Sequence, residues 1–380
     1  MKKFLRYAIA AAGLFLCTIC LSPSGNTSAK EIQYNVTSYG VKGNGTTNDT
    51  DAINDLLEKA ADLSSGDTLV LYFPNGKYAI DDWLRIYSNT TLKLADKAEI
   101  FRSKIQYPIM MNVGSDGTRM ENSPAGGGYN LSKNIKIIGG TLNGGNISKA
   151  KESGNLINFA HAQNITFDGV KINNCYGAHM IELSGVKNAS IKNCDFSGFR
   201  TKKELETSLN EDKNLNKTGY AAKECIQLDY TYNHSTKKTF QWCPGYWSDK
   251  TACQNITIEN NSFHDYPRGV GNHHGRETFS NLWTQNIIIR NNTFKNMYVM
   301  TPTGKKLYEN AILLHSFKNA VVEGNTIENA GTGVLLVYDS GSAIRNNVMT
   351  NLQSTAIVAA KTSAGSTVTG NVLTDIPRYG

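Results

Sequence analysis

The residues best suited to acid–base chemistry occupy matched places in a repeat. Each repeat contains a strand with large apolar residues facing inward, so the residues between them face outward. One outward column contains Glu182 and Gln227, and the next contains Asp229, His273 and His315. Stacked strands lie about 4.8 Å apart, and the two carboxyl groups are one coil and two residues apart, which predicts a separation of about 8 Å. That distance leaves room for a water molecule between an acid and a base.

This spacing predicts a specific division of roles. Either Asp229 or Glu182 protonates a leaving oxygen while the other activates water, as in inverting glycosidases, whose carboxyl groups lie about 6.5–9.5 Å apart. The histidines at 273 and 315 would tune the pKa of the carboxyl groups or orient a hydroxyl. Gln227 and Lys361 would contact substrate, and His274 would be a turn residue or a second substrate contact. The alternative interpretation is that an outward polar ladder is an ordinary solvated sheet face.

The repeat itself predicts the scaffold. Each unit has a strand, a short turn and an Asn-apolar-x-apolar segment, and the period in the twenties with glycine-rich turns indicates an all-β solenoid. The position six residues after the repeat asparagine is again asparagine in the last five coils: Asn261, Asn292, Asn325, Asn347 and Asn371. Amides stacked at one turn can hydrogen-bond from coil to coil, so we expect this column to be buried.

Two insertions, at about 200–223 and 232–252, flank the strand that carries Asp229. The second contains Tyr232, Trp242 and Trp247, flat side chains on which sugar rings stack, and loops on a rigid scaffold are common binding elements. These aromatic residues could instead pack only on one another. Cys243 and Cys253 bracket the insertion, and we expect them to form a disulfide in an oxidising compartment.

The N-terminal residues predict export. Residues 1–29 combine a basic start, a short apolar run and a small-residue exit, which is typical of a secretory signal peptide; a membrane anchor is the alternative. Residues 30–80 would form a cap whose helix, at residues 50–61, closes the open end of the solenoid. The net charge of +7 favours an anionic partner, but the basic residues are scattered, so we expect an acidic polysaccharide and no nucleic acid. After signal cleavage we expect a secreted, soluble monomer without membrane contact.

Two segments of the cap resemble a known family. Residues 35–53 read NVTSYGVKGNGTTNDTDAI and residues 70–78 read VLYFPNGKY. This opening is similar to that of pectate-lyase-like proteins, the group that contains polygalacturonases and rhamnogalacturonases. The resemblance implies a right-handed parallel β-helix over residues 81–380, capped by the N-terminal helix, and action on a polysaccharide.

The sequence departs from the polygalacturonase site pattern. Polygalacturonases carry Asn-Thr-Asp, Asp-Asp, Gly-His-Gly and Arg-Ile-Lys motifs on successive coils. The corresponding places here read Gly177-Ala178-His179, Lys223-Glu224, Pro267-Arg268-Gly269 and Leu313-Leu314-His315. Only Glu224 keeps a carboxylate, so the polygalacturonase catalytic roles cannot be transferred to this chain.

Three functional hypotheses follow. The first is a secreted glycoside hydrolase that cleaves an acidic or amino-sugar polysaccharide and requires no cofactor. The second is a polysaccharide lyase in which Asp229, Glu182 or Glu224 holds Ca²⁺ and a basic residue removes a proton. The candidate bases are Arg268, His273 and His315. The third is a non-catalytic carbohydrate-binding adhesin that uses the aromatic insertion.

Overall fold

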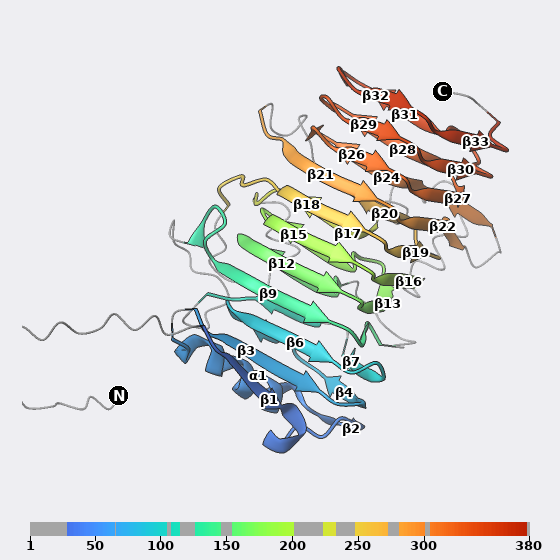
Figure 1. The fold of residues 1–380 in the computed structure, drawn as a ribbon. Helices are drawn as coiled ribbons and strands as arrows, with labels where there is room; N and C mark the ends of the chain where they lie inside the picture. Colours follow the sequence, from blue (N-terminus) through green and yellow to red (C-terminus); the bar gives the residue numbers. More distant parts are fainter. Residues whose placement is uncertain are drawn as a thin grey trace, which may run out of the picture.

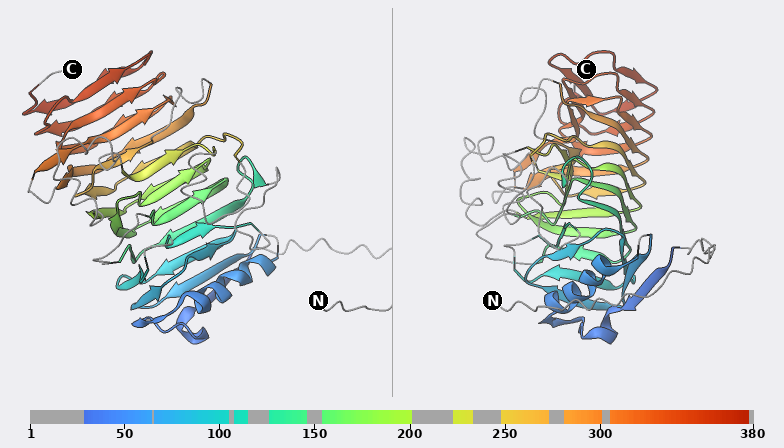
Figure 2. Two further views of the ribbon diagram at one scale, coloured as in Figure 1. Left: turned by 180° about the vertical axis from the view of Figure 1, so that it is seen from behind. Right: turned by 90° about the vertical axis from the view of Figure 1, so that its left-hand side faces the viewer.

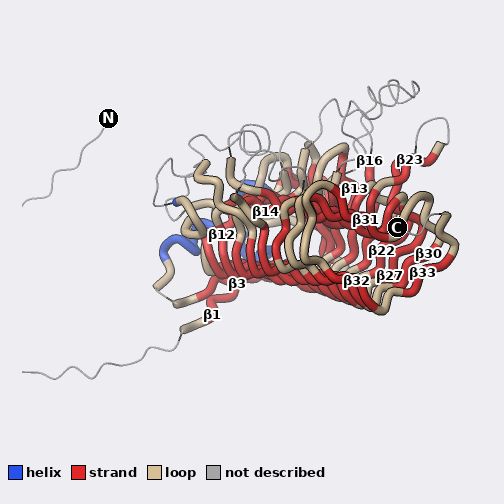
Figure 3. The backbone as a smooth tube through the Cα atoms, turned by 90° about the horizontal axis from the view of Figure 1, so that it is seen from above, coloured by secondary structure: helices blue, strands red, loops and turns tan. Residues whose placement is uncertain are grey.

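The chain winds into a solenoid of parallel strands. The computed structural model describes residues 29–64, 66–104, 108–114, 126–145, 154–200, 223–232, 248–272, 281–300 and 305–377. In these residues three long sheets run the length of the molecule, and most coils contribute one strand to each (Figure 1). Viewed from above, the strands of successive coils stack in register (Figure 3). The predicted parallel β-helix is therefore confirmed.

Each sheet is ordered by sequence, as expected of a solenoid. The first sheet contains β1 (Glu31–Asn35), β3 (Thr68–Phe73), β6 (Thr90–Leu94), β9 (Ser132–Ile138), β12 (Ala162–Asp168), β15 (Lys187–Lys192), β18 (Gln254–Glu259), β21 (Thr284–Arg290), β26 (Val321–Glu323), β29 (Ala343–Arg345) and β32 (Thr367–Thr369), with β25 (Phe317–Lys318) beside β21. The second sheet contains β2 (Asn44–Asn48), β4 (Gly76–Ile80), β7 (Ala98–Arg102), β10 (Thr141–Asn143), β13 (Lys171–Tyr176), β16 (Asp195–Arg200), β19 (Ser262–His264), β22 (Thr293–Met300), β27 (Thr326–Ala330), β30 (Val348–Thr350) and β33 (Val372–Thr374), with β23 (Lys306–Tyr308) antiparallel to β22. The third sheet contains β5 (Leu84–Ile86), β8 (Met110–Asn112), β11 (Ile157–Ala160), β14 (Ile181–Ser184), β17 (Glu224–Asp229), β20 (Arg268–Gly271), β24 (Asn310–His315), β28 (Thr332–Val337) and β31 (Ile357–Ala360).

The interior is filled by columns of identical or similar side chains. Phe196, Phe263 and Phe294 are buried, and their rings stack at centroid distances of 4.8 and 4.7 Å. The predicted asparagine column is also confirmed. Along it, the Nδ2 of each asparagine donates to the Oδ1 of the next at 2.9–3.0 Å and to a backbone carbonyl at 2.9–3.0 Å. The column thus satisfies backbone oxygens that the bend leaves without a strand partner.

The N-terminal end is closed by the predicted helix. α1 (Thr50–Glu58) continues into the 3₁₀-helix η2 (Lys59–Asp62), and a shorter 3₁₀-helix, η1 (Val36–Tyr39), follows β1. α1 lies across the end of the coils (Figure 2), burying Ile53, Leu56 and Leu57. Asn48 accepts from the backbone N–H of Thr50, whereas the Asp49 carboxylate accepts from a turn at residues 42–43. No helix in the described residues is long and apolar enough to cross a membrane.

Several predictions concern residues that the structure does not describe. They are the signal peptide over residues 1–28, the insertions at 201–222 and 233–247, and the site residues His273, His274, Trp242, Trp247 and Cys243.

Candidate functional site

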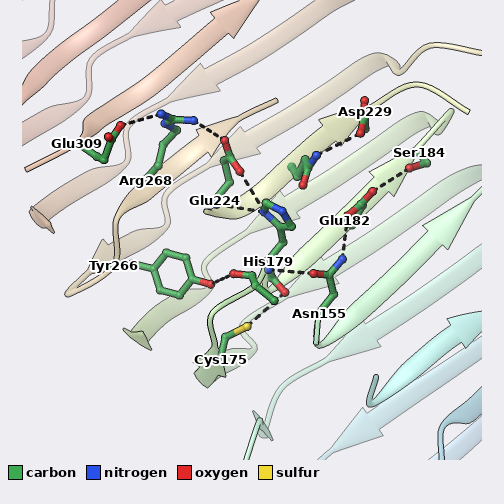
Figure 4. A network of polar contacts seen from close by, with 12 residues as sticks. Asn155, Cys175, His179, Glu182, Ser184, Glu224, Asp229, Tyr266, Arg268 and Glu309 are labelled. Carbon is green, nitrogen blue, oxygen red and sulfur yellow. Dashed lines mark hydrogen bonds and ion pairs between the residues drawn. The ribbon is translucent and has the colours of Figure 1, made fainter. Parts of the chain in front are cut away.

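The third sheet brings the predicted carboxyl groups together with the expected register. Asn158, Glu182, Gln227 and Gly271 lie side by side on adjacent strands, and Ser184 pairs with Asp229. Glu182 is therefore one strand and two residues from Asp229, which places their Cα atoms about 8 Å apart. Figure 4 shows the side chains of Glu182 and Asp229 on the same face of the sheet.

One expectation about this face is wrong, because its polar residues are not solvated. Asn158, Glu182, Gln227 and Asp229 are only 2%, 1%, 3% and 0% exposed. Strand alternation determines which face a side chain joins, but it does not determine whether other parts of the chain cover that face. The site is thus a closed polar layer, in which uncompensated charge is costly.

The two carboxyl groups have different surroundings. Glu182 Oε2 accepts from Asn155 Nδ2 at 2.8 Å, and Oε1 accepts from Ser184 Oγ at 3.3 Å. Asp229 accepts from its neighbour's backbone N–H at 2.8 Å and from Gln227 Nε2 at 3.2 Å. Burial, followed by the charge of Glu182, raises the pKa of Asp229 well above its ordinary value. Its surroundings therefore favour the neutral, protonated form of the Asp229 carboxyl.

A second polar group lies at the starts of the same strands. Arg268 Nη1 donates to Glu224 Oε1 at 2.6 Å, and Nη2 donates to Glu309 Oε2 at 2.7 Å. His179 Nδ1 lies 3.0 Å from Glu224 Oε2 and accepts the Glu224 backbone N–H at 3.2 Å. Asn155 joins this group to the carboxyl pair, because its Oδ1 accepts from the His179 backbone N–H at 3.0 Å (Figure 4). The two groups therefore form one continuous network.

The environment of Arg268 is incompatible with the role of a base. Burial alone would lower the pKa of Arg268, but the charges of Glu224 and Glu309 raise it above its ordinary value. An arginine held between two carboxylates cannot accept a proton from a substrate. Arg268 instead neutralises Glu224, which it contacts across the register pair of β17 and β20. The predictions that Arg268 and Glu224 act directly on substrate lose their support.

Gly271 provides the space for this ion pair. A β-carbon at Gly271 would lie 3.1 Å from Arg268 Cδ and 3.2 Å from Glu224 Oε1. Contacts this short would force the two side chains to shift. The glycine in the Glu182–Gln227 column is therefore required by the charged groups that pass over it.

Two other described candidates, His315 and Tyr232, differ in their distance from the carboxyl pair. His315 is 9% exposed, and its ring stacks on Tyr338 at 5.8 Å. The pairing of Ile226 with Val270 and of Val270 with Ile312 places His315 two strands from Asp229, about 10 Å away. Tyr232 is buried, and burial together with the charges of Asp229 and Glu182 raises its pKa. Tyr232 therefore lies near the pair but exposes little surface for stacking.

Lys361 is not in the predicted column. Val337 pairs with Ala360, so the last coil is displaced by one residue from the predicted register. Lys361 follows the strand with a φ of 59°, and its Nζ lies 6.0 Å from the centre of the Tyr338 ring. It is a turn residue outside the Asp229 column.

The predicted disulfide is also wrong. Cys253 is a free, fully buried thiol whose Sγ donates to the carbonyl of Leu183 at 3.2 Å. It stands two residues before Asn255, where other repeats place inward residues such as Val186 and Ala162. Cys253 is therefore a core residue, as Cys194 is at 3% exposure.

Sequence reasoning missed Asn155, His179 and Glu309 as members of the network. His179 precedes Ile181 by two residues, as Glu224 precedes Ile226 and Arg268 precedes Val270. A third column could therefore have been counted at the strand starts. Among the described residues, no three His, Cys, Asp or Glu side chains are grouped so that they could hold a metal ion.

The solenoid and its polar layer define a right-handed parallel β-helix protein of the pectate-lyase-like type. A model described as "Right handed beta helix region" matches residues 224–380, and one described as "Rhamnogalacturonase A/epimerase, pectate lyase-like" matches residues 33–300. The chain belongs to this rhamnogalacturonase A/epimerase, pectate-lyase-like family. The resemblance seen in the sequence is confirmed.

Similar proteins include both binders and enzymes. The chain is 27% identical over 334 residues to "Plasmin and fibronectin-binding protein A" of Streptococcus pneumoniae, covering 82% of this chain and 41% of that protein. The chain thus spans about two fifths of this relative. The crystal structure of PfbA, a surface adhesin of the same species, aligns with a TM-score of 0.68 at 23% identity, covering 93% of this chain and 80% of that one. The structure of a Yersinia enterocolitica family 28 exopolygalacturonase aligns with a TM-score of 0.54 at 14% identity, covering 92% of this chain and 66% of that one. These structural similarities establish the fold.

Proposed function

We propose that the protein is an exported glycoside hydrolase that cleaves a polysaccharide by inversion, with Asp229 as acid and Glu182 as base. The observation that carries the proposal is the buried carboxyl pair. Burial and the charge of Glu182 favour the protonated form of Asp229, as an acid requires, and Glu182 accepts hydrogen bonds from the side chains of Asn155 and Ser184. The spacing of about 8 Å between their Cα positions is compatible with a water molecule between base and anomeric carbon.

Gln227 would fix a substrate hydroxyl between the two groups. Its Nε2 donates to Asp229, while its Oε1 is buried without a hydrogen-bond partner. An unpaired buried acceptor costs free energy that a ligand donor would recover. Because Glu182 and Asp229 are closed to solvent, binding of a polymer requires a more open conformation than the one described.

The nature of the substrate belongs to the same proposal. The relatives include a polysaccharide-degrading enzyme, and the net charge of +7 favours an anionic chain. We expect an acidic or amino-sugar polysaccharide as substrate. A lyase acting through Arg268 is disfavoured, since the guanidinium is held between two carboxylates.

A second candidate function is adhesion at the cell surface. It is favoured by the similarity to the plasmin- and fibronectin-binding protein and by the closed state of the carboxyl pair. In that case the chain would bind a carbohydrate or a host protein without cleaving it.

Product analysis on a panel of polysaccharides separates these candidates. A hydrolase generates new reducing ends, whereas a lyase generates an unsaturated end that absorbs in the near ultraviolet. A binder retains polysaccharide in a pull-down but generates neither product. New reducing ends that disappear in the Asp229→Asn variant would support the proposal, and absorbing products would contradict it.

A further inference from the structure

A hollow on the first sheet lies away from the carboxyl pair. It has a volume of about 580 Å³, within the usual range of ligand pockets, roughly 300–1,000 Å³. Its lining comes from seven neighbouring strands of the first sheet: β1, β3, β6, β9, β12, β15 and β18. The outer face of these strands is turned toward the viewer in Figure 1. Six steps of about 4.8 Å give it a length of about 29 Å along the solenoid axis. It is therefore a groove suited to an extended polymer.

One wall of the groove is an ordered ladder of amides. Its members share a left-handed backbone with φ of 56–59°, which asparagine tolerates, and are Asn89, Asn134, Asn164, Asn188 and Asn255. Each Nδ2 donates to the Oδ1 of the preceding asparagine, at 2.8, 3.0, 3.4 and 3.2 Å. Each amide keeps a second N–H and a second lone pair. The ladder therefore presents donor–acceptor pairs whose orientation is already fixed, which lowers the entropy cost of binding.

Three hydroxyl side chains and one lysine form the second column of the lining. Thr91, Lys136, Thr166 and Ser190 occupy matched positions on adjacent strands, two residues beyond the asparagines. Among the described residues that line the groove, Lys136 and Glu31 are charged and none is aromatic. Recognition here would depend on hydrogen bonds to neutral polar groups.

We propose that this groove binds a linear glycan chain. Vicinal hydroxyls can exchange pairs of hydrogen bonds with amides and with threonine or serine hydroxyls. A peptide fits less well, because the backbone groups of this face already pair with neighbouring strands and the described lining is mostly polar, with Ile165 and Ala189 as its apolar side chains. Nucleic acid would require several cations along its path, whereas the groove has Lys136. The groove is a second carbohydrate site, independent of cleavage at Asp229.

The test blocks the groove with two single tyrosine substitutions, each called a plug. Thr166→Tyr and Ser190→Tyr put a bulky, strand-compatible side chain on its floor. Thr257→Tyr is the matched control, because Thr257 continues the same column one strand beyond Ser190 but does not line the groove. Binding of cellohexaose and of hexagalacturonate is measured by calorimetry on the full chain carrying Asp229→Asn, so that cleavage cannot consume the ligand. Thermal unfolding checks that each variant is folded.

We expect each plug to weaken binding by at least about tenfold and the control to change it by less than about twofold. Binding of both sugars supports recognition of hydroxyls, and binding of hexagalacturonate alone supports a contact between its carboxylates and Lys136. Undiminished binding in both folded plug variants, equal loss in the control, or binding of an extended neutral peptide in place of the sugars would overturn the proposal. If the plug variants lose binding and the wild-type chain, with Asp229 intact, shows no turnover, the groove proposal stands and the hydrolase proposal is rejected.

Discussion

On the third sheet, the same outward columns have opposite character in the middle and in the last coils. In β14 and β17 they carry Glu182, Gln227 and Asp229, which are polar and at most 3% exposed. In β28 they carry Leu335 and Val337, which are apolar and half-buried. A sheet selected for stability alone would do the reverse, because burying polar groups costs free energy and burying apolar groups releases it. This difference is the reason that we place the proposed function in the middle coils and not in the last coils.

The largest effect should come from the carboxyl pair. Asp229→Asn retains the shape of the side chain but removes its proton, so turnover should fall by at least about 100-fold. Val337→Asn is the control, because it lies in the same column three strands away, about 14 Å, and should change turnover by less than about twofold. Reducing-end assays measure both. Equal turnover by wild type and Asp229→Asn would mean that Asp229 has no catalytic role and that the two regions do not differ in function.

The buried ion pair should dominate stability. Glu224→Gln leaves Arg268, 4% exposed, with one of its two carboxylates, and removing a partner from a buried pair costs about 3–5 kcal/mol. Glu328→Gln breaks the exposed contact between Lys295 Nζ and Glu328 Oε2, 3.2 Å long, and should cost at most about 1 kcal/mol. Urea denaturation of both variants tests this. Similar losses would mean that the network does not stabilise the middle coils.

The raised pKa of Asp229 predicts that stability depends on pH. The pKa of Asp229 is higher in the folded protein than in the unfolded chain. Its contribution to stability is therefore fully present below pH 3.8, its ordinary pKa, and is lost as pH rises through its pKa in the folded protein. Asp229→Asn removes this loss. The free energy of unfolding of the variant should therefore rise relative to that of the wild type, by up to about 1.4 kcal/mol per pH unit in that window. Unfolding measured from pH 4 to 9 checks the sign. A difference that is constant across this range would show that Asp229 is ionised when folded.

The smallest effect should come from chelation. Acid–base hydrolysis by two carboxyl groups needs no cation, so removal of Ca²⁺ with EDTA should change turnover by less than about twofold. Activity that disappears with EDTA and returns with added Ca²⁺ would instead favour the lyase.

The sequence predicted the fold and the register of the middle coils because large apolar residues there alternate with polar ones. Ile181, Ile226 and Val270 align with no ambiguity. The run Ala356-Ile357-Val358-Ala359-Ala360 has no such alternation, so its register was predicted one residue out, and Lys361 with it. Register is specified only where the two faces of a strand differ.

The candidate site was predicted only in part. The positions of Glu182 and Asp229 followed from the repeat, but their burial did not, because periodicity gives the face of a residue and not what covers it. Glu309 reaches Arg268 from beyond the strand, which no spacing rule predicts. The position of Cys253 in the repeat, two residues before Asn255, predicts a core residue. Its short distance along the chain from Cys243 suggested a disulfide instead.

The most direct test of the acid–base pair is the anomeric configuration of the first product. Proton NMR of the reaction, recorded before the free sugar equilibrates, distinguishes inversion from retention. A pair whose backbone positions lie about 8 Å apart predicts inversion, with turnover reduced at least about 100-fold in Asp229→Asn and in Glu182→Gln. A retained configuration would contradict the assignment of Glu182 as a base acting through water, and release of product by the Asp229→Asn variant at the wild-type rate would contradict the assignment of Asp229 as the acid.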